Sequence, residues 1–440
     1  MRNGRCGLDG GAAGGGAATA GGGDIAPAGG GEAGGGAPTA GGGEAGGGTS
    51  GGGTAGGGTA GGGGTAGGGT AGGGTAGGGM PTFYDGGESC DGVRPRLQCD
   101  PPVTLASTGL FKAPVLGFID GGMVYGWANG LRFELFTATD AGTVKVVDEV
   151  AVSGINKTEL STASDVWAAI YHSGENNPIR CFASSGSTAV SPGVAGYNGG
   201  AGVAVSPYGD VAVVRGYAMG VTNYMGWSMG DAGCPGPFTA LRADLQSDYL
   251  TALWSPVYGF RFTSCGPINS GLGDVGISAP LPDGGLLFSS VLESHGGPGD
   301  QSAFLSSNGN YALVAFSAET STPPYTLLAR SIPVDLSTPV DDTFDYPITH
   351  TFLSWHSSGC GPGCMATAWT SDRPPYNPHV TFTTDTQVVR NRSASDAGWD
   401  VVCNTSPDDT EVRSAYSGGR LHVMVSEPNR VRLFSCDVPP

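Results

Sequence analysis

The sequence predicts an all-β protein: a single β-propeller of about seven four-stranded blades, preceded by a disordered glycine-rich segment. Three observations predict it. From residue 103 onward, short runs rich in Val, Ile and aromatic residues alternate with turn signals. No linker rich in proline and glycine divides 103–440 into separate sandwiches. At about 40–50 residues per blade, the 338 residues from 103 to 440 supply roughly seven blades.

The first part of the chain divides at residue 79. Residues 1–79 are dominated by Gly, Thr and Ala, end in iterated Gly-Gly-Gly-Thr-Ala, and offer no apolar surface to bury. We expect a flexible tether that holds the following domain away from a surface. Residues 80–102 form a connector containing Cys90 and Cys99. Its acidic run, Asp85 to Gly92, offers oxygen ligands for calcium but does not match an EF-hand loop.

The charge balance disfavours nucleic acid as a partner. The 440 residues carry a formal net charge of −18. Two arginines against four acidic residues leave 1–79 at −2, so the remainder carries −16. Lysine occurs only three times, as Lys112, Lys145 and Lys157. A nucleic-acid-binding protein needs a basic surface, whereas an acidic surface suits cationic or neutral partners.

The stretch from Val203 to Val214 sets the pattern of the predicted strands. Two β-branched runs flank Ser206-Pro207-Tyr208-Gly209-Asp210, in which proline and glycine favour a tight turn. Residues 241–254 are the one helix candidate, although their alternation also allows a strand. Further strands or hairpins are predicted at 114–127, 131–136, 144–152, 166–171, 179–183, 275–290, 303–316, 325–334, 350–355, 365–370, 380–383, 388–390, 411–416, 421–426 and 431–436.

Three turns carry a resemblance to the TolB type of WD-like propeller repeats. They are Ser206-Pro207-Tyr208-Gly209, Leu281-Pro282-Asp283-Gly284 and Ser306-Ser307-Asn308-Gly309. The resemblance spans about 103–440 and implies that each of these turns joins the inner two strands of a blade. The spacing is irregular, since Gly309 follows Gly284 by only 25 residues.

The ten cysteines favour an oxidising, extracytoplasmic compartment. No apolar run is long enough for a transmembrane helix. The connectivity cannot be derived from sequence, and the pairs we favour leave Cys181 free and buried. They are Cys90 with Cys99, Cys234 with Cys265, Cys360 with Cys364, and Cys403 with Cys436.

Cys6 stands directly before the glycine-rich tether. A cysteine, a flexible spacer and a globular body resemble a processed bacterial lipoprotein, which implies lipidation of Cys6 and a location on the outer cell surface. A stray thiol is the alternative, because no lipobox precedes Cys6. Met1 to Cys6 also lacks the apolar region of a signal peptide, so we expect a mis-assigned start or a truncated leader.

Gly226-Trp227-Ser228-Met229-Gly230 matches the G-x-S-x-G nucleophile elbow of α/β-hydrolases, which makes Ser228 a candidate nucleophile. His295-Gly296-Gly297-Pro298-Gly299 resembles an oxyanion loop but follows the serine instead of preceding it. The proline- and glycine-rich residues after Gly230 cannot form the required helix. The G-x-G-x-x-G at Gly271 to Gly276 also lacks a following helix, so it does not indicate a nucleotide site.

A zinc site could be drawn from two histidines and two cysteines. A tetrahedral site would use His350, His356, Cys360 and Cys364. In an exported protein, Cys360-Gly-Pro-Gly-Cys364 is more simply a loop closed by its own disulfide, so we favour the disulfide and predict no metal or other cofactor.

The sequence favours a non-catalytic function: an exported, surface-tethered monomer that binds an extracellular or cell-surface protein or glycan. Loop aromatics commonly anchor partners, and Tyr197, Tyr208, Tyr224 and Trp227 lie in glycine-rich connections. These aromatic residues could instead fill gaps between blades. Two alternatives remain open: an enzyme, either a serine hydrolase using Ser228 or another propeller-based hydrolase or lyase, and a structural component of the cell envelope.

Overall fold

The computed structural model describes residues 96–439, apart from several segments. These segments are 152, 174–178, 191–199, 220–221, 237–239, 243–248, 268–272, 282–285, 289–291, 294–300, 306–310, 319–324, 337–342, 349–351, 362–363, 372–376, 385–397 and 403–409. The chain divides into two units, Met1–Thr82 and Phe83–Pro440, and all described residues belong to the second.

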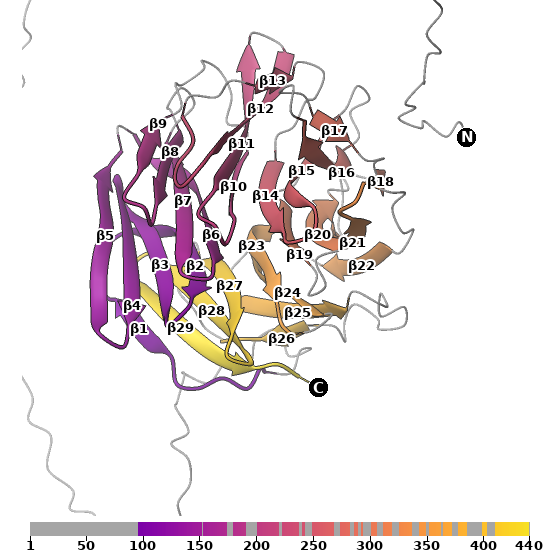
Figure 1. Cartoon of the computed structure of the whole chain (residues 1–440). Coiled ribbons are helices and arrows are strands. Elements are labelled where there is room, and N and C mark those ends of the chain that lie inside the picture. Colours follow the sequence, from indigo (N-terminus) through magenta and orange to yellow (C-terminus); the bar gives the residue numbers. More distant parts are fainter. Residues whose placement is uncertain are drawn as a thin grey trace, which may run out of the picture. The chain divides into compact units, whose positions relative to one another are not determined.

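The second unit is a β-propeller of seven antiparallel sheets arranged in a ring (Figure 1). Blade 1 contains β2 (Phe111–Ile119), β3 (Gly122–Asn129), β4 (Arg132–Thr139) and β5 (Gly142–Val150). Blade 2 contains β6 (Ile155–Ala163), β7 (Val166–Ser173), β8 (Ile179–Ala183) and β9 (Thr188–Val190). Blade 3 contains β10 (Ala201–Val205), β11 (Val211–Met219), β12 (Thr222–Gly230) and β13 (Ala240–Arg242).

Blades 4 to 7 complete the ring. Blade 4 contains β14 (Tyr249–Ser255), β15 (Gly259–Pro267), β16 (Gly273–Pro280) and β17 (Leu286–Phe288), and β18 (Leu292–Glu293) also pairs with β16; blade 5 contains β19 (Gln301–Leu305), β20 (Tyr311–Ala318), β21 (Tyr325–Pro333) and β22 (Thr343–Ile348). Blade 6 contains β23 (Phe352–Gly359), β24 (Cys364–Ser371), β25 (Pro378–Thr384) and β26 (Gly398–Asp400). Blade 7 contains β27 (Glu411–Ser417), β28 (Arg420–Glu427), β29 (Arg430–Asp437) and β1 (Val103–Ala106).

Blade 7 closes the ring by joining the two ends of the described chain. The first strand, β1, pairs antiparallel with the last, β29, and supplies the outermost strand of the blade. Figure 1 shows indigo β1 beside yellow β29. The disulfide Cys99–Cys436 and the hydrogen bond from Asp437 N to Gln98 O, at 2.8 Å, reinforce this pairing.

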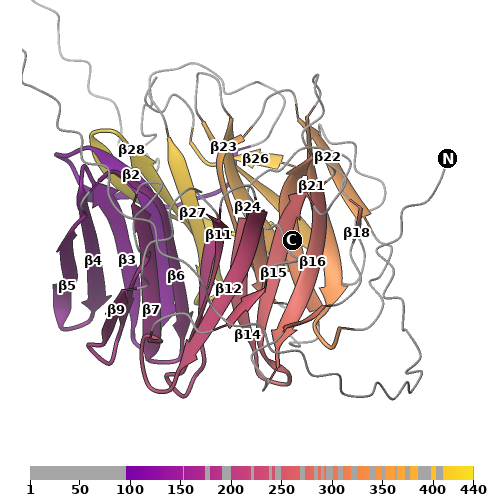
Figure 2. The same cartoon turned by 90° about the horizontal axis from the view of Figure 1, so that it is seen from above.

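The first strand of each blade faces the central axis, and we call these seven strands the inner strands. They contact one another in the ring order β2, β6, β10, β14, β19, β23, β27 and back to β2. Figure 2 shows the blades standing side by side. Neighbouring inner strands run in the same direction. The beginnings of β10 and β14 lie together at Gly202 and Thr251, and the ends of β2 and β6 lie together at Gly117 and Thr162. The turns that follow them, the inner turns, therefore lie on one face, which we call the inner-turn face.

Apolar residues fill the spaces between blades. One buried cluster joins blades 1 and 2 through Phe133, Tyr171 and Phe182, and another joins blades 3 and 4 through Trp227, Leu250 and Phe262. The alternation of each strand puts one set of side chains on each face of a sheet, so both faces of a blade pack against neighbours. Gly202 permits a close approach of two blades, because a Cβ there would lie 2.5 Å from the backbone nitrogen of Ala252 on β14.

The predicted propeller and its blade number are confirmed, whereas part of the turn assignment is wrong. Ser206 to Gly209 is the inner turn of blade 3, as predicted, and residues 306–309 lie in the connection between β19 and β20, the first two strands of blade 5. Residues 281–284 instead connect β16 to β17, the outer pair of blade 4. The spacing of 25 residues to Gly309 is short because the two turns occupy different positions in their blades. Part of the helix candidate, 249–254, is strand β14.

The disulfide pairing differs from three of the four predicted pairs. Cys360–Cys364 is present as predicted. The pair Cys90–Cys99 is wrong because Cys99 bonds Cys436, which also excludes Cys403–Cys436. The pair Cys234–Cys265 is wrong because Cys234 bonds Cys181, so Cys181 is not free. The first correction arises from the pairing of β1 with β29, which closes the ring, and the second from the packing of blade 2 against blade 3. Cys90 and Cys403 lie outside the described residues.

We predict that removing the closing disulfide destabilises the protein more than removing the local one. Cys99 and Cys436 are 337 residues apart in sequence, and Cys360 and Cys364 are four apart. A cross-link that closes a longer loop removes more entropy from the unfolded chain, and loss of such a bond costs about 2–5 kcal/mol. Chemical denaturation of the Cys99→Ser/Cys436→Ser and Cys360→Ser/Cys364→Ser variants measures the difference; equal losses would contradict the closing role.

Candidate functional site

A cavity of about 640 Å³ occupies the centre of the ring. Its described walls come from the inner strands β2, β6, β10, β14, β23 and β27. The lining extends to Ala163, Trp254, Gly361 and Tyr416, which stand where these strands end, so the cavity reaches the inner-turn face. Concave sites with a mixed apolar and polar lining are the usual places for ligands.

A polar group lies on the cavity wall between blades 6 and 7. Ser358 Oγ donates to Ser414 Oγ at 3.0 Å, and Ser414 Oγ donates to the backbone oxygen of His356 at 3.1 Å. Ser414 N donates to His356 Nδ1 at 3.4 Å. Burial, together with the smaller effect of the charge of Arg413, lowers the pKa of His356 to about 3. The imidazole is therefore neutral at neutral pH, with its proton on Nε2.

This wall can donate and accept hydrogen bonds, but it does not form a serine nucleophile with its base. The hydroxyl proton of Ser414 is directed to a carbonyl, and Ser414 is buried. Nδ1 of His356 lies 3.5 Å from Ser414 Oγ but accepts a hydrogen bond from the backbone amide of Ser414 at 3.4 Å, so it is not positioned as the base of a triad.

Arg413 stands one residue before the lining residue Ser414. Its Nη1 donates to Val412 O at 2.9 Å and its Nη2 to Thr158 O at 3.5 Å, which links β27 to β6. Glu159, which lines the cavity, lies 3.9 Å from Lys157.

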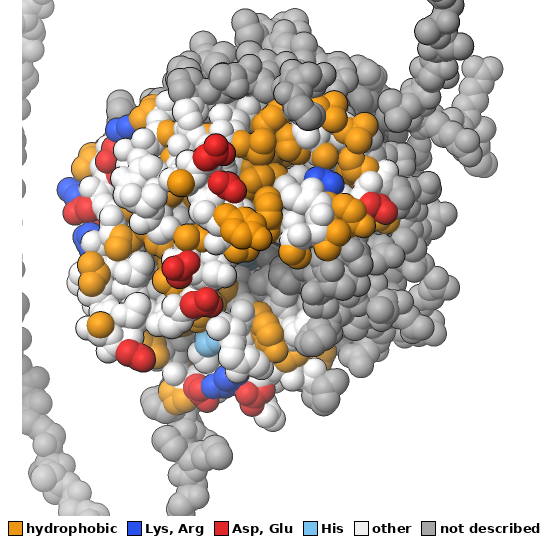
Figure 3. Space-filling model, in the orientation of Figure 1, with side chains coloured by type: hydrophobic (Ala, Val, Ile, Leu, Met, Phe, Trp, Pro, Cys, Tyr) orange, Lys and Arg blue, Asp and Glu red, His pale blue; other side chains and the backbone are white. Residues whose placement is uncertain are grey.

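The mouth of the cavity carries the most exposed aromatic residue that the structure describes, Tyr208. Its side chain is 82% exposed and meets Trp254 edge to face, with ring centroids 6.5 Å apart. Ser206 Oγ accepts hydrogen bonds from Tyr208 N at 3.2 Å and Asp210 N at 3.1 Å, and Gly209 takes a φ of 93°. This fixed turn holds Tyr208 out into solvent next to the cavity. On the face in Figure 3, hydrophobic side chains gather near the centre with acidic ones among them.

Of the other predicted binding aromatics, the structure describes only the side chain of Trp227, and it does not lie beside Tyr208. The prediction that Trp227 contacts a ligand at the surface is wrong. Trp227 is 7% exposed and packs against Phe262, with ring centroids 6.0 Å apart, in the core between blades 3 and 4. It fills a gap between blades, the alternative considered from sequence. Tyr197 and the side chain of Tyr224 lie outside the described residues.

Ser228 does not occupy a nucleophile elbow. It lies inside β12, opposite Val213 of β11, and is 6% exposed. An elbow requires a sharp turn between a strand and a helix that presents the serine at the surface, and a strand interior provides none of this. His295, of the proposed oxyanion fragment, lies outside the described residues.

No metal centre is found among the described residues. They contain no group of three or more His, Cys, Asp and Glu side chains that could hold an ion. The alternative zinc site loses its thiolates because Cys360 and Cys364 are bonded to each other. His350, the connector run from Asp85 to Gly92 and Cys6 lie outside the described residues.

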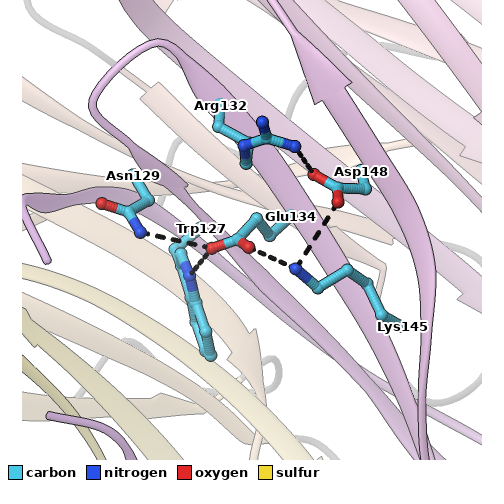
Figure 4. Close-up of polar contacts among 6 residues, drawn as sticks. All are labelled: Trp127, Asn129, Arg132, Glu134, Lys145 and Asp148. Carbon is cyan, nitrogen blue, oxygen red and sulfur yellow. Dashed lines mark hydrogen bonds and ion pairs between the residues drawn. The ribbon is translucent and has the colours of Figure 1, made fainter. Parts of the chain in front are cut away.

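A second polar cluster, in blade 1, is structural (Figure 4). The Glu134 carboxylate accepts from Trp127 Nε1 at 3.0 Å and from Lys145, which also lies 3.7 Å from Asp148. Asp148 in turn pairs with Arg132. Burial raises the pKa of Glu134, but the hydrogen bonds from Lys145 and Trp127 outweigh it and hold this pKa below its ordinary value. The cluster ties β3, β4 and β5 together and lies on outer strands, away from the cavity lining.

Sequence reasoning missed the lining residues Phe118, Trp254 and Tyr416, and it considered His356 only as a zinc ligand. They stand within or at the ends of inner strands. A usable signal exists for most of them: an aromatic residue directly before a turn in the first strand of a hairpin, as in Phe118-Ile119-Asp120-Gly121.

Comparisons with known proteins agree with the fold. No protein-family model and no curated protein matches the chain. Similar solved structures include a hydrazine synthase of Kuenenia stuttgartiensis (TM-score 0.50, 10% identity, 76% of this chain and 97% of that one). A Mitotic Checkpoint Complex chain (TM-score 0.49, 13%, 82% and 98%) and virginiamycin B lyase from Staphylococcus aureus (TM-score 0.46, 9%, 76% and 99%) are also similar. At these identities the likeness concerns the fold alone.

We predict that a fluorophosphonate probe does not label Ser228. The serine is buried in a strand and has no exposed face for the reagent. Labelling of the intact protein, read by mass spectrometry, tests this. Wild type and Ser228→Ala should be equally unlabelled at this position, and a label on wild type that Ser228→Ala abolishes would restore the hydrolase hypothesis.

We also predict that His356 makes stability depend on pH. Its folded pKa of about 3 lies below the ordinary value of 6.5. The unfolded chain therefore binds a proton that the folded one does not, and stability falls as pH drops from about 6.5 toward 3. The expected contribution is up to about 1.4 kcal/mol per pH unit. Urea denaturation between pH 6.5 and 4.5 should show a shallower loss for His356→Gln than for wild type; equal slopes would contradict this assignment.

Proposed function

We propose that this protein is a non-catalytic binding module whose ligand, a protein or glycan, docks on the inner-turn face at the mouth of the central cavity. One observation carries the proposal: Tyr208 is held 82% exposed by a hydrogen-bonded turn, edge-on to Trp254 at the cavity wall. A soluble protein gains nothing from a rigid, exposed aromatic side chain, whereas tyrosine at an interface contributes a large contact area at low entropic cost.

The chemistry of the described cavity supports binding over catalysis. Its hydroxyls and the neutral His356 can orient a ligand, and the described residues bring no activated nucleophile or paired carboxylates together there. The enzyme alternative, including a propeller lyase or hydrolase, therefore has no described residues to carry it. A purely structural envelope role is separated from binding by the experiment below.

We further propose that the protein is exported and surface-tethered. Disulfides such as Cys99–Cys436 and Cys181–Cys234 suit an oxidising compartment. The described residues include no helix long and apolar enough to cross a membrane. Attachment through the glycine-rich residues 1–79, lipidation of Cys6, a bacterial origin, the monomeric state and the TolB-like family assignment are parts of this proposal that rest on the sequence.

We predict that Tyr208→Ala removes ligand binding without loss of stability. The probes are an immobilised glycan array and a displayed random-peptide library, both selected against the wild-type protein. Loss of an exposed aromatic anchor should weaken selected binders by ten-fold or more, since such anchors contribute about 2 kcal/mol or more.

The matched control is Leu131→Ala, which removes an exposed apolar side chain (49%) from the β3–β4 turn, on the opposite face. Binders should tolerate it. If the screens yield no binder, or if every binder is indifferent to Tyr208→Ala, the proposed binding site is wrong and the structural role becomes the better account.

A further inference from the structure

Aspartates recur on the inner turns of three consecutive blades. Asp120 lies on the inner turn of blade 1, Asp165 on that of blade 2, and Asp210 on that of blade 3. Asp120 N donates to Ser164 O at 2.6 Å, which fixes the first two turns against each other. Asp120 and Asp165 are exposed. We call these three residues, together with exposed Asp231 on the β12–β13 connection, the acidic arc.

No Lys or Arg side chain that the structure describes neutralises the acidic arc. None of its four carboxylates forms an ion pair with a described residue. Arg420 is already paired with Asp100 and Asp437, and Arg261 donates to the carbonyl oxygens of Val334, Tyr258 and Phe260. The body carries a net charge of −16, so no distant excess of positive charge offsets the arc. Acidic side chains stand near the centre of the face in Figure 3.

An apolar feature adjoins the acidic arc. Tyr208 and Asp210 belong to one turn, and the ring of Tyr208 packs edge to face against Trp254 at the cavity wall. Beside Trp254 the cavity is lined by apolar residues, among them Leu160, Val203 and Leu253. One face thus offers unpaired negative charge over blades 1 to 3 and an aromatic-rimmed apolar cavity next to it. The complementary ligand has both positive charge and an apolar group.

From this charge complementarity we infer that the ligand is a basic segment of a protein partner, with Arg or Lys side chains over the acidic arc and an aliphatic or aromatic side chain directed into the cavity. This inference rests on the proposed binding function and narrows it from protein or glycan to a cationic peptide. Complementary charge raises the rate of association and fixes orientation.

Other occupants fit the face less well. Residues 1–95 of this chain carry three arginines against seven acidic residues, so the acidic arc repels this segment. A neutral glycan could use Tyr208 and the cavity but would leave the unpaired carboxylates without a role. Nucleic acid would meet like charge.

The experiment uses the full chain and a fluorescein-labelled peptide, Arg-Arg-Leu-Arg-Arg, with Gln-Gln-Leu-Gln-Gln as its uncharged counterpart. Fluorescence anisotropy is measured for wild type, Asp120→Asn/Asp165→Asn, Tyr208→Ala and the control Asp140→Asn. Asp140 is an exposed aspartate on the β4–β5 turn, at the outer edge of blade 1. Asp210 is left unchanged because Ser206 Oγ donates to its carboxylate at 3.2 Å and the turn depends on it.

We expect the arginine peptide to bind wild type and to lose about five- to ten-fold in affinity in both Asp120→Asn/Asp165→Asn and Tyr208→Ala. Asp140→Asn should change the affinity by less than two-fold, added salt should weaken binding, and the glutamine peptide should bind at least ten-fold less tightly. Undetectable binding of the arginine peptide to wild type, or equal effects of the arc and Asp140 variants, would overturn the inference.

The two proposals fail separately. The binding function stands if glycans or neutral peptides from the earlier screens need Tyr208. The inference of a basic partner is then wrong if the arginine peptide binds wild type and Asp120→Asn/Asp165→Asn with equal affinity. If no ligand of any kind depends on Tyr208, the binding function itself fails.

Discussion

Closure of the ring by β1 on β29 is the constraint on which the rest of the structure depends. The pairing of Val103 with Leu433 places the beginning of the propeller in its last blade. Cys99–Cys436 and the hydrogen bond from Leu97 N to Asp400 O, at 2.8 Å, hold the preceding segment against blades 7 and 6. Because the ring is closed, β27 meets β2, as Glu411 Oε2 does where it accepts from Ala113 N. The cavity has a fixed width only under that condition.

The inner strands fill the spaces between blades and line the cavity with different residues. Side chains on their two faces fill the spaces between blades, while their last residues, such as Trp254 and Tyr416, reach the cavity and the inner turns. Close approach near the axis needs small residues, and Gly117 and Gly202 supply it beside Thr162 and Thr251. The aromatic rim and the acidic arc therefore stand on a rigid scaffold, which suits recognition by preformed surfaces.

Much of the fold could be predicted from sequence, because turn chemistry and alternation are local. The hairpin at Ser206 to Gly209, the all-β class and the blade number from chain length are of this kind. The disulfides could not be predicted, because they depend on tertiary contacts: Cys99 pairs with Cys436 through closure of the ring, and Cys181 pairs with Cys234 through the packing of blade 2 against blade 3. For the candidate site, Tyr208 was selected as an aromatic residue in a glycine-rich turn, and the structure shows it exposed there. Trp227 was misplaced because a motif in a glycine-rich sequence does not reveal which face of a strand is buried.

Hydrogen exchange of the native protein, read by mass spectrometry, tests ring closure most directly. If β1 is an integral strand of blade 7, the amides of 103–106 that bond to β29 exchange as slowly as those of β29 itself, and both become exposed in the same opening event. If these amides instead exchange at the rate of an unstructured chain while β29 remains protected, the ring is not closed by β1, and the account of the cavity and its mouth would have to be abandoned.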